Sequence, residues 1–202
     1  MDEDGNEEMI KIILIGDVGV GKTNLINVAS GRGFNENEKS TLSASYSKKD
    51  VHINGQTYKI SLWDTIGQEK LRNLSKLFFK NSKIVVFVFD ITNRTSFNGL
   101  ALWEQDVREM LGDDNIVKAI VGNKQDLYLE EQVSESEAIE YAKSHRVKFK
   151  LTSAKRDPEG FSLFLEELLK DYLNKQILRE RSIVITKENN NKKRAKSKSG
   201  CC

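Results

Sequence analysis

The stretch IKIILIGDVGVGKT, residues 10–23, is an apolar run followed by a glycine-rich loop that ends in Lys-Thr. Gly16 to Thr23 fits the pattern G-x-x-x-x-G-K-[ST], and a helix-patterned segment, KTNLINVAS, follows. A strand before and a helix after are the context this motif needs, because backbone N–H groups and the helix N-terminus then surround phosphate. Lys22 is predicted to reach the β and γ phosphates of a nucleoside triphosphate, and Thr23 to bind Mg²⁺. The alternative is a glycine-rich turn without a ligand.

Further apolar runs lie at 58–64, 84–90 and 116–122, with a shorter one at 147–153. Several are apolar at consecutive positions, which is typical of strands covered on both faces. Helix-patterned segments lie between them, so a parallel sheet is expected. An Asn-Gly pair within 51–60 predicts a hairpin that adds one antiparallel strand. The predicted fold is α/β, a six-stranded, mostly parallel sheet with helices on both faces.

The last helix-patterned segment begins near Pro158, the only proline, whose missing N–H costs nothing at a helix start. Apolar periodicity fades after about residue 178, and the remaining polar, basic stretch cannot form a core. We therefore expect a flexible tail. The predicted organisation is a flexible acidic N-terminus at 1–9, a nucleotide-binding domain at 10–177 and a basic tail at 178–202.

The bulk properties fit one soluble domain. The chain has 202 residues, with 38% hydrophobic and 31% charged residues, which is ordinary for a globular protein. The net charge of +2 hides two poles, an acidic start and a basic end. The apolar run at 84–89 is far shorter than the roughly 18 residues of a membrane span. The acidic opening MDEDGNEE differs from a secretory signal, so no export is expected.

The only two cysteines, Cys201 and Cys202, are the last two residues of the chain. Adjacent terminal thiols cannot staple a fold, and a metal site would need further Cys or His at set spacings. His52 and His145 are isolated and are interpreted as surface histidines. An accessible pair of nucleophilic sulfurs suited to covalent modification remains, with a reducing cytosol as the expected setting.

Two short segments suggest which base is bound. NKQD (123–126) and TSAK (152–155) each follow a predicted strand, and ligands in open α/β sheets sit at the carboxyl ends of strands. Asp126 can accept hydrogen bonds from both N1–H and the exocyclic amine of guanine, whereas adenine offers no such pair. Taken singly, either tetrapeptide also fits a polar loop. Their order and positions together favour guanine.

A third segment, WDTIGQE (63–69), also follows a strand. Asp64 is predicted to support Mg²⁺, Gly67 to offer its N–H to a γ-phosphate, and Gln68 to orient an attacking water. Gln68 and Lys22 are therefore the candidate catalytic residues.

In these motifs the sequence resembles a Ras-superfamily small GTPase of the Rab branch, over about residues 10–175 and again at the terminal CC. The resemblance implies a P-loop NTPase fold of the small-GTPase type, with GTP/GDP and Mg²⁺ as cofactors. Thr41 matches the switch I threonine that meets Mg²⁺ and γ-phosphate, so the metal set is Thr23, Thr41 and Asp64. Ala154 matches the residue whose N–H reads the guanine oxygen. The stretch STLSASY, residues 40–46, looks most like endosomal members.

The resemblance also places residues around the nucleotide and on an effector surface. Asn123 and Lys124 match residues that brace the phosphate loop and cover the base, and Phe34 lies near the position of an aromatic that stacks on guanine or ribose. Tyr46, Trp63 and Phe78 match three aromatics displayed to effectors; core packing is the alternative for them. The expected nucleotide contacts are Asp17, Val18, Gly19, Val20, Gly21, Lys22, Thr23, Asn24, Phe34, Thr41, Gly67, Asn123, Lys124, Asp126, Ser153, Ala154 and Lys155.

Two residues depart from the family pattern beside the chemistry. Ile66 stands where switch II normally has Ala, and Val18 stands in the phosphate loop where Gly or Ser is usual. Val18 would point to where an activating protein inserts its catalytic side chain, worth on the order of 10³ to 10⁵ in rate. The hypothesis is slow GTP hydrolysis. The alternative is that neighbouring residues accommodate both side chains.

The resemblance gives the tail a role, since Rab-like chains ending in CC commonly carry geranylgeranyl groups on both sulfurs. Two lipids hold a protein on a bilayer where one is marginal. The basic residues between 192 and 198 would add attraction to an anionic leaflet. Nucleic acid is disfavoured as a partner, because no aromatic residue interleaves the run and no base-reading module precedes it.

The function implied is a membrane-anchored GTP/GDP switch in vesicle traffic, with switch I at about 32–47 and switch II at about 65–79. The family implies effectors, an exchange factor, a GTPase-activating protein, a GDP-dissociation inhibitor and prenylation machinery as partners of a monomer. The expected location is the cytoplasmic face of intracellular, endosomal membranes, and the cytosol when GDP-bound and extracted. The rivals are a GTP-bound scaffold with little turnover and an ATP-using P-loop kinase.

Overall fold

The structure is a computed structural model that describes residues 9–38, 41, 45–65, 79–112 and 116–198, with side chains as far as residue 182. Its strands are β1 (Ile10–Ile15), β2 (Ser45–Ile53), β3 (Gln56–Asp64), β4 (Ile84–Asp90), β5 (Val117–Asn123) and β6 (Lys148–Leu151). Its helices are α1 (Lys22–Ala29), α3 (Arg94–Asn98), α4 (Leu100–Leu111), the 3₁₀ helix η2 (Gln125–Glu130), α5 (Glu135–Ser144) and α6 (Pro158–Lys198).

The six strands form one sheet in the order β2-β3-β1-β4-β5-β6. Only the β2–β3 pair is antiparallel, and the other neighbours are parallel. Asn54 and Gly55 connect β2 to β3 with positive φ angles of 51° and 78°. Two successive positive φ angles are what a two-residue hairpin turn with the right twist requires. The predicted α/β sheet and its hairpin are both confirmed.

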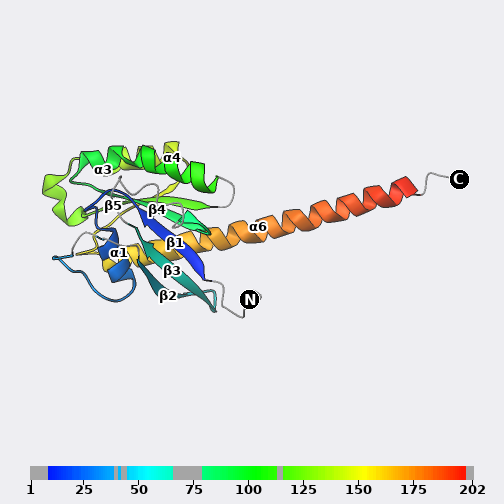
Figure 1. The fold of residues 1–202 in the computed structure, drawn as a ribbon, viewed down its shortest axis with the longest axis horizontal. Helices are drawn as coiled ribbons and strands as arrows, with labels where there is room; N and C mark the ends of the chain where they lie inside the picture. The colour runs from blue at the N-terminus through cyan, green and yellow to red at the C-terminus, as the bar shows by residue number, and fades with distance from the viewer. Residues whose placement is uncertain (1–8, 39–40, 42–44, 66–78, 113–115, 199–202) are drawn as a thin grey trace.

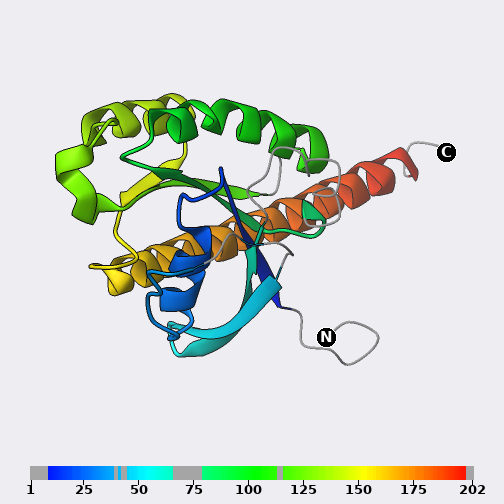
Figure 2. The ribbon, with the colours of Figure 1, turned by 60° about the vertical axis from the view of Figure 1, so that its left-hand side comes forward.

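The sheet is covered on both faces, as the consecutive apolar runs predict (Figures 1 and 2). Along β1, Ile12 and Leu14 pack in the cluster beneath α1 and α6, whereas Ile13 and Ile15 pack in the cluster beneath α4 and α5. All seven residues of β4 are buried. Successive side chains of a strand point to opposite faces, so a strand between two helical layers must be apolar at every position.

Helix α6 begins at Pro158, as predicted, and packs an apolar stripe against the first of these clusters. The sequence predicts a flexible tail from residue 178, whereas the structure continues α6 as a helix to Lys198, projecting away from the sheet (Figure 1). The reason is local: residues 178–198 contain neither glycine nor proline and are rich in Lys, Arg and Glu, which tolerate helix well. Lost amphipathicity removes packing, but it does not by itself end a helix.

No helix in the described part of the chain has both the length and the apolar character that crossing a bilayer requires. Both histidines are on the surface: His52 hydrogen-bonds Thr57, and His145 stacks on Tyr141.

Candidate functional site

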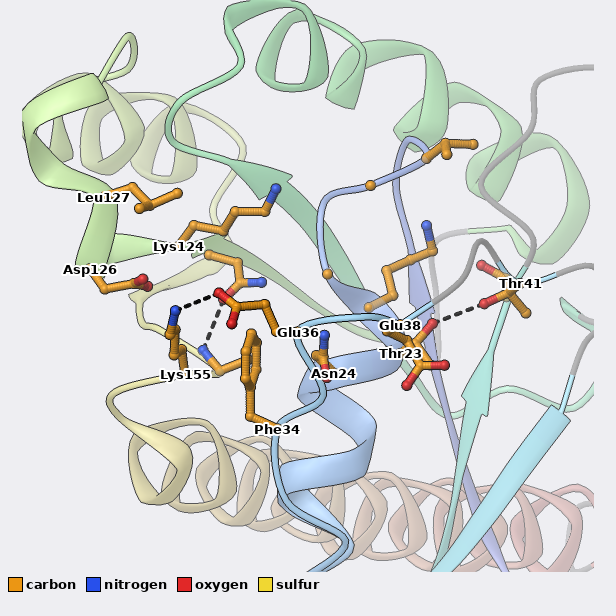
Figure 3. A pocket seen from close by; sticks show the side chains of 17 residues that line it. Thr23, Asn24, Phe34, Glu36, Glu38, Thr41, Lys124, Asp126, Leu127 and Lys155 are labelled. Carbon is orange, nitrogen blue, oxygen red and sulfur yellow. Dashed lines mark hydrogen bonds and ion pairs between the residues drawn. The ribbon is translucent and has the colours of Figure 1, made fainter.

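A pocket with a volume of about 320 Å³ lies at the carboxyl ends of the parallel strands (Figure 3). Its walls come from the loop before α1, the segment after α1, and the loops that follow β3, β5 and β6. This volume is within the range of small-molecule sites. The lining residues are Val18, Gly19, Gly21, Lys22, Thr23, Asn24, Phe34, Glu36, Glu38, Thr41, Thr65, Asn123, Lys124, Asp126, Leu127, Ala154 and Lys155.

The phosphate loop needs glycine at two of its positions. A Cβ on Gly16 would lie 2.1 Å from the carbonyl oxygen of Val88, and a Cβ on Gly21 would lie 2.3 Å from Asn123 Nδ2. Gly21 also has a φ of 94°, which L side chains rarely adopt. Gly21 is the N-cap of α1 and provides no side-chain hydrogen bond to the first helical N–H groups. Those groups therefore have no side-chain cap, and the residues at this helix start, Gly21, Lys22 and Thr23, line the pocket, as an anion site at a helix N-terminus requires.

The Lys22 side chain folds back against the phosphate loop. Its side chain is only 5% exposed, and Nζ donates hydrogen bonds to the carbonyl oxygens of Gly16 and Asp17, both at 2.8 Å. Burial lowers the pKa of the Lys22 ammonium to about 8, although Asp64 and Asp17 oppose the shift. Burying a cation is costly unless it is paired. The two carbonyl groups offset the positive charge of Lys22 only in part. An anionic ligand beside Lys22 would complete the compensation.

Two hydroxyls and a carboxylate meet next to Lys22. Thr23 Oγ1 and Thr41 Oγ1 are 2.9 Å apart, and they donate to Asp64 Oδ2 at 2.8 and 3.1 Å. Asp64 Oδ1 is buried and has no hydrogen-bond partner within the described ranges. Burial raises the pKa of the Asp64 carboxyl, against the effect of both threonine hydrogen bonds. The cluster therefore has an unsatisfied hard oxygen beside two hydroxyls.

This donor set fits Mg²⁺. The ion prefers oxygen ligands and is usually held by one or two carboxylates together with substrate phosphates, rather than by a full protein cage. Among the residues that the structure describes, no group of three His, Cys, Asp or Glu side chains is placed to hold a metal. A cation here would consequently depend on the threonine hydroxyls, Asp64 and the phosphates of a ligand.

Asn123, at the end of β5, joins three segments of the site. Its Nδ2 donates to the carbonyl oxygen of Val20 at 2.8 Å, and its Oδ1 accepts the N–H of Ala154 at 3.1 Å. The Ala154 N–H, expected to read a guanine oxygen, is thus already engaged and would have to be shared with a ligand or redirected toward it. The Asn123 side-chain amide therefore links the phosphate loop to the loops that follow β5 and β6.

Asp126 and Lys124 are also fixed by partners. Ser153 Oγ donates to Asp126 Oδ1, which leaves the other carboxylate oxygen for the pocket. Lys124 has a left-handed backbone, with φ 68°, and its Nζ lies 2.6 Å from Asp90 Oδ2, a buried carboxylate. An Asp carboxylate held by a hydroxyl on one side can present its remaining acceptors in a fixed direction.

Three predicted contact residues do not line the pocket. The Asp17 side chain turns away and accepts a hydrogen bond from Trp103 Nε1 at 2.9 Å. Val20 is 1% exposed and packs in the core, although its carbonyl binds Asn123. Ser153 acts behind Asp126. Ile66, Gly67, Gln68, Phe78, Cys201 and Cys202 lie outside the described residues, so predictions on them stay predictions.

Sequence reasoning missed several residues of the site. Glu36, Glu38, Thr65 and Leu127 line the pocket. Thr65 lies within the WDTIGQE segment and Leu127 directly follows NKQD, so both could have been included on that ground. Glu36 and Glu38 lie in a polar segment without periodicity, and no local signal points to them.

Two of the predicted effector aromatics form a pair on the β2–β3 hairpin. Tyr46 and Trp63 are register partners, and their rings stack with centroids 5.1 Å apart. Tyr46 is 49% exposed, so it is not a core residue, whereas Trp63 is partly buried beneath it. Lys11 Nζ lies 4.0 Å from the Trp63 ring centre. The use of this surface by effectors stays a prediction.

Comparison of the sequence with known proteins identifies its relatives. The family model described as Ras family matches residues 11–174. Ras-related protein Rab-21 of Geodia cydonium is 38% identical over 156 residues, 77% of this chain and 68% of that protein. Rab-2B of Dictyostelium discoideum is 35% identical over 167 residues, 81% and 82% of the two chains. Human Rab-21 is 38% identical over 162 residues, 80% and 72%.

The lowered pKa of Lys22 predicts a pH dependence of ligand binding. Without ligand, the ammonium loses its proton as the pH rises through about 8. Phosphates favour the charged form, so binding above pH 8 must take up a proton. The affinity for GDP should therefore fall with rising pH, by at most about tenfold per pH unit. Calorimetry between pH 7 and 9, in buffers of different ionisation enthalpy, measures both effects.

Lys22→Met is the matched control, because it removes the titrating group and keeps the guanine contacts. Its binding should be weaker but should lack this proton uptake. Equal pH slopes for the wild type and Lys22→Met would show that another group is responsible.

Proposed function

The chain belongs to the Rab branch of the Ras superfamily of small GTPases, and on that premise we propose that it binds GTP and GDP in the pocket described above and acts as a membrane-anchored switch. As a Rab-branch protein it is a GTPase of vesicle trafficking. The observation that carries the proposal is the convergence, around one pocket, of the Lys22 loop, of Thr23 and Thr41 with Asp64 hydrogen-bonded behind them, and of Asp126.

The pocket divides the ligand into parts by chemistry. The amides of residues 17–23 and the Lys22 ammonium suit the phosphates, because both present positive charge in a buried setting. Asp126 suits guanine, which carries two adjacent N–H donors. Phe34 lines the opening beside Lys155, where an aromatic ring can cover base or ribose. The nucleoside end and the phosphate end are thereby bound by different loops of one sheet edge.

Thr23, Thr41 and Asp64 would hold Mg²⁺ in this pocket. When bound, the cation neutralises charge on the β and γ phosphates. Thr41 belongs to switch I, so a ligand that engages its hydroxyl orders that segment, and loss of γ-phosphate releases it. We propose Gln68 as the residue that orients the attacking water and Lys22 as the group that stabilises charge on the phosphates.

Hydrolysis is proposed to be slow. Val18 lines the pocket and is 44% exposed, so its side chain occupies space beside the phosphate loop. A β-branched side chain there has few rotamers with which to move aside. A GTP-bound scaffold with little turnover is the second candidate, and this position of Val18 favours it. Accommodation by neighbouring residues remains the alternative to both.

Anchoring is proposed through prenyl groups on Cys201 and Cys202, assisted by the basic tail. The corresponding location is the cytoplasmic face of intracellular, endosomal membranes, with a cytosolic GDP-bound form. The partners are effectors, an exchange factor, a GTPase-activating protein, a GDP-dissociation inhibitor and prenylation machinery. The stacked Tyr46 and Trp63 pair supports an effector surface on the hairpin, because exposed aromatics are typical interface residues.

Nucleotide competition tests the proposed function. The wild type should select GDP over ADP, and Asp126→Asn should bind GDP about 100-fold more weakly or worse, since two charge-assisted hydrogen bonds are lost. Xanthosine diphosphate, which carries an acceptor in place of the guanine amine, should partly restore binding to that variant. Equal binding of GDP and ADP by the wild type would exclude a guanine nucleotide switch and favour an ATP enzyme.

Single-turnover hydrolysis tests the slow reaction. Val18→Gly and Ile66→Ala should each increase the rate on the order of fivefold, the effect of roughly 1 kcal/mol on the barrier. Val18→Ile, with a larger side chain at the same place, should not. Unchanged rates in both shortened variants would mean that the two side chains are accommodated.

Intact-mass measurement of the natively expressed protein tests the anchor. The mass should exceed that of the polypeptide by two prenyl groups, and Cys201→Ser should remove one of them and shift the protein from the membrane fraction toward the soluble one. A mass equal to the bare polypeptide would leave the thiols without this role.

A further inference from the structure

Residues 34–38, which we call the strap, cross the opening of the pocket between α1 and the loop after β6 (Figure 3). The strap is exposed along its length and has no helix or strand of its own. Such a segment normally lacks a fixed position, because little buried surface holds it. Here it is attached at both sides of the opening.

The first attachment joins the strap to α1. Asn24 Nδ2 donates to the carbonyl oxygen of Asn35 at 2.9 Å, and the N–H of Asn35 donates to Asn24 Oδ1 at 2.9 Å. One side-chain amide thus pairs with both backbone groups of a single strap residue. A reciprocal pair of this kind fixes direction as well as distance, since both bonds must be broken for the segment to swing away.

Further hydrogen bonds within the strap and from α1 stiffen it. Asn35 Nδ2 and Asn27 Nδ2 donate to Glu38 Oε2 at 3.1 and 3.3 Å, and the Asn37 N–H donates to Asn35 Oδ1 at 3.1 Å. These bonds hold the strap in a compact turn against α1. Displacement of one end is consequently passed along the segment.

The second attachment lies on the base side of the pocket. Lys155 Nζ donates to Glu36 Oε1 at 2.8 Å, across 119 positions of sequence, and lies 5.8 Å from the centre of the Phe34 ring. The hydrogen bond from Lys155 also lowers the pKa of the Glu36 carboxyl. Glu36, Lys155 and Phe34 all line the pocket. A molecule bound in the pocket would therefore lie next to this pair.

We propose that the Glu36–Lys155 pair closes the strap over bound nucleotide, so that Glu36 is a positioning residue that slows nucleotide release. The inference rests on the proposed binding of GTP and GDP. Glu36 acts through Lys155 and Phe34, so its contribution should appear in the residence time of the bound nucleotide. The opposing effect is repulsion between the Glu36 carboxylate and an anionic ligand, which Lys155 neutralises.

Release of a fluorescent GDP analogue from the full-length protein, chased with excess GDP, tests the proposal. Glu36→Gln should release it about two- to fivefold faster, the range expected for an exposed ion pair. Glu140→Gln, an exposed glutamate on α5 outside the site, is the matched control and should leave release unchanged. Salt should accelerate release from the wild type more than from Glu36→Gln, because screening weakens the pair.

A second background separates the pair from the fold. Lys155→Met keeps the apolar stem beside Phe34 but removes the charge, so adding Glu36→Gln to it should not accelerate release, and relief of the repulsion between Glu36 and the phosphates should if anything slow it. Unchanged or slower release from Glu36→Gln, or an equal effect in the Lys155→Met background, would overturn the proposal while GDP binding stands. Failure of the wild type to bind the analogue would overturn the proposed function with it.

Discussion

The buried ammonium of Lys22 is the constraint on which the site depends. A cation with so little contact with water must be surrounded by oxygen, and the loop from Gly16 to Gly21 supplies it by folding its carbonyl groups inward. That path of the loop needs glycine at two positions, because Gly16 passes too close to β4, and Gly21 too close to Asn123, for either to carry a Cβ. The first N–H groups of α1, which follow this turn, receive no side-chain cap. The carbonyl groups of the loop thus compensate the positive charge of Lys22, and the N–H groups at the start of the helix provide a site for an anion.

The parallel sheet brings the other walls of the pocket next to the phosphate loop. Strands that run in one direction end at the same edge, so Asp64, Asn123 and the Ser153–Lys155 loop reach the phosphate loop from distant parts of the chain. Asn123 fixes two of these loops with two hydrogen bonds. Among the described residues, one buried oxygen of Asp64 has no hydrogen-bond partner, and burial lowers the pKa of Lys22. Binding sites often keep polar groups in such unfavourable settings at a cost in stability.

Most of the architecture follows from the sequence because its signals are local. The loop at 16–23, the Asn54–Gly55 turn and the start of α6 at Pro158 each follow from a few neighbouring residues. Pairings between distant side chains do not. The hydrogen bond between Asp17 and Trp103 joins residues 86 positions apart, and neither residue alone announces it. The continuation of α6 beyond residue 178 does not follow from apolar periodicity, because periodicity reports burial, whereas helix persistence depends on propensity.

The projecting part of α6 would have a geometric consequence if the chain is anchored through its last two residues, as proposed. A helix rises 1.5 Å per residue, so residues 178–198 span about 30 Å. A stalk of that length would set a stand-off between the lipid surface and the globular body. A partner would then have to reach across this gap, and a bend anywhere along the stalk would reorient the whole body relative to the bilayer.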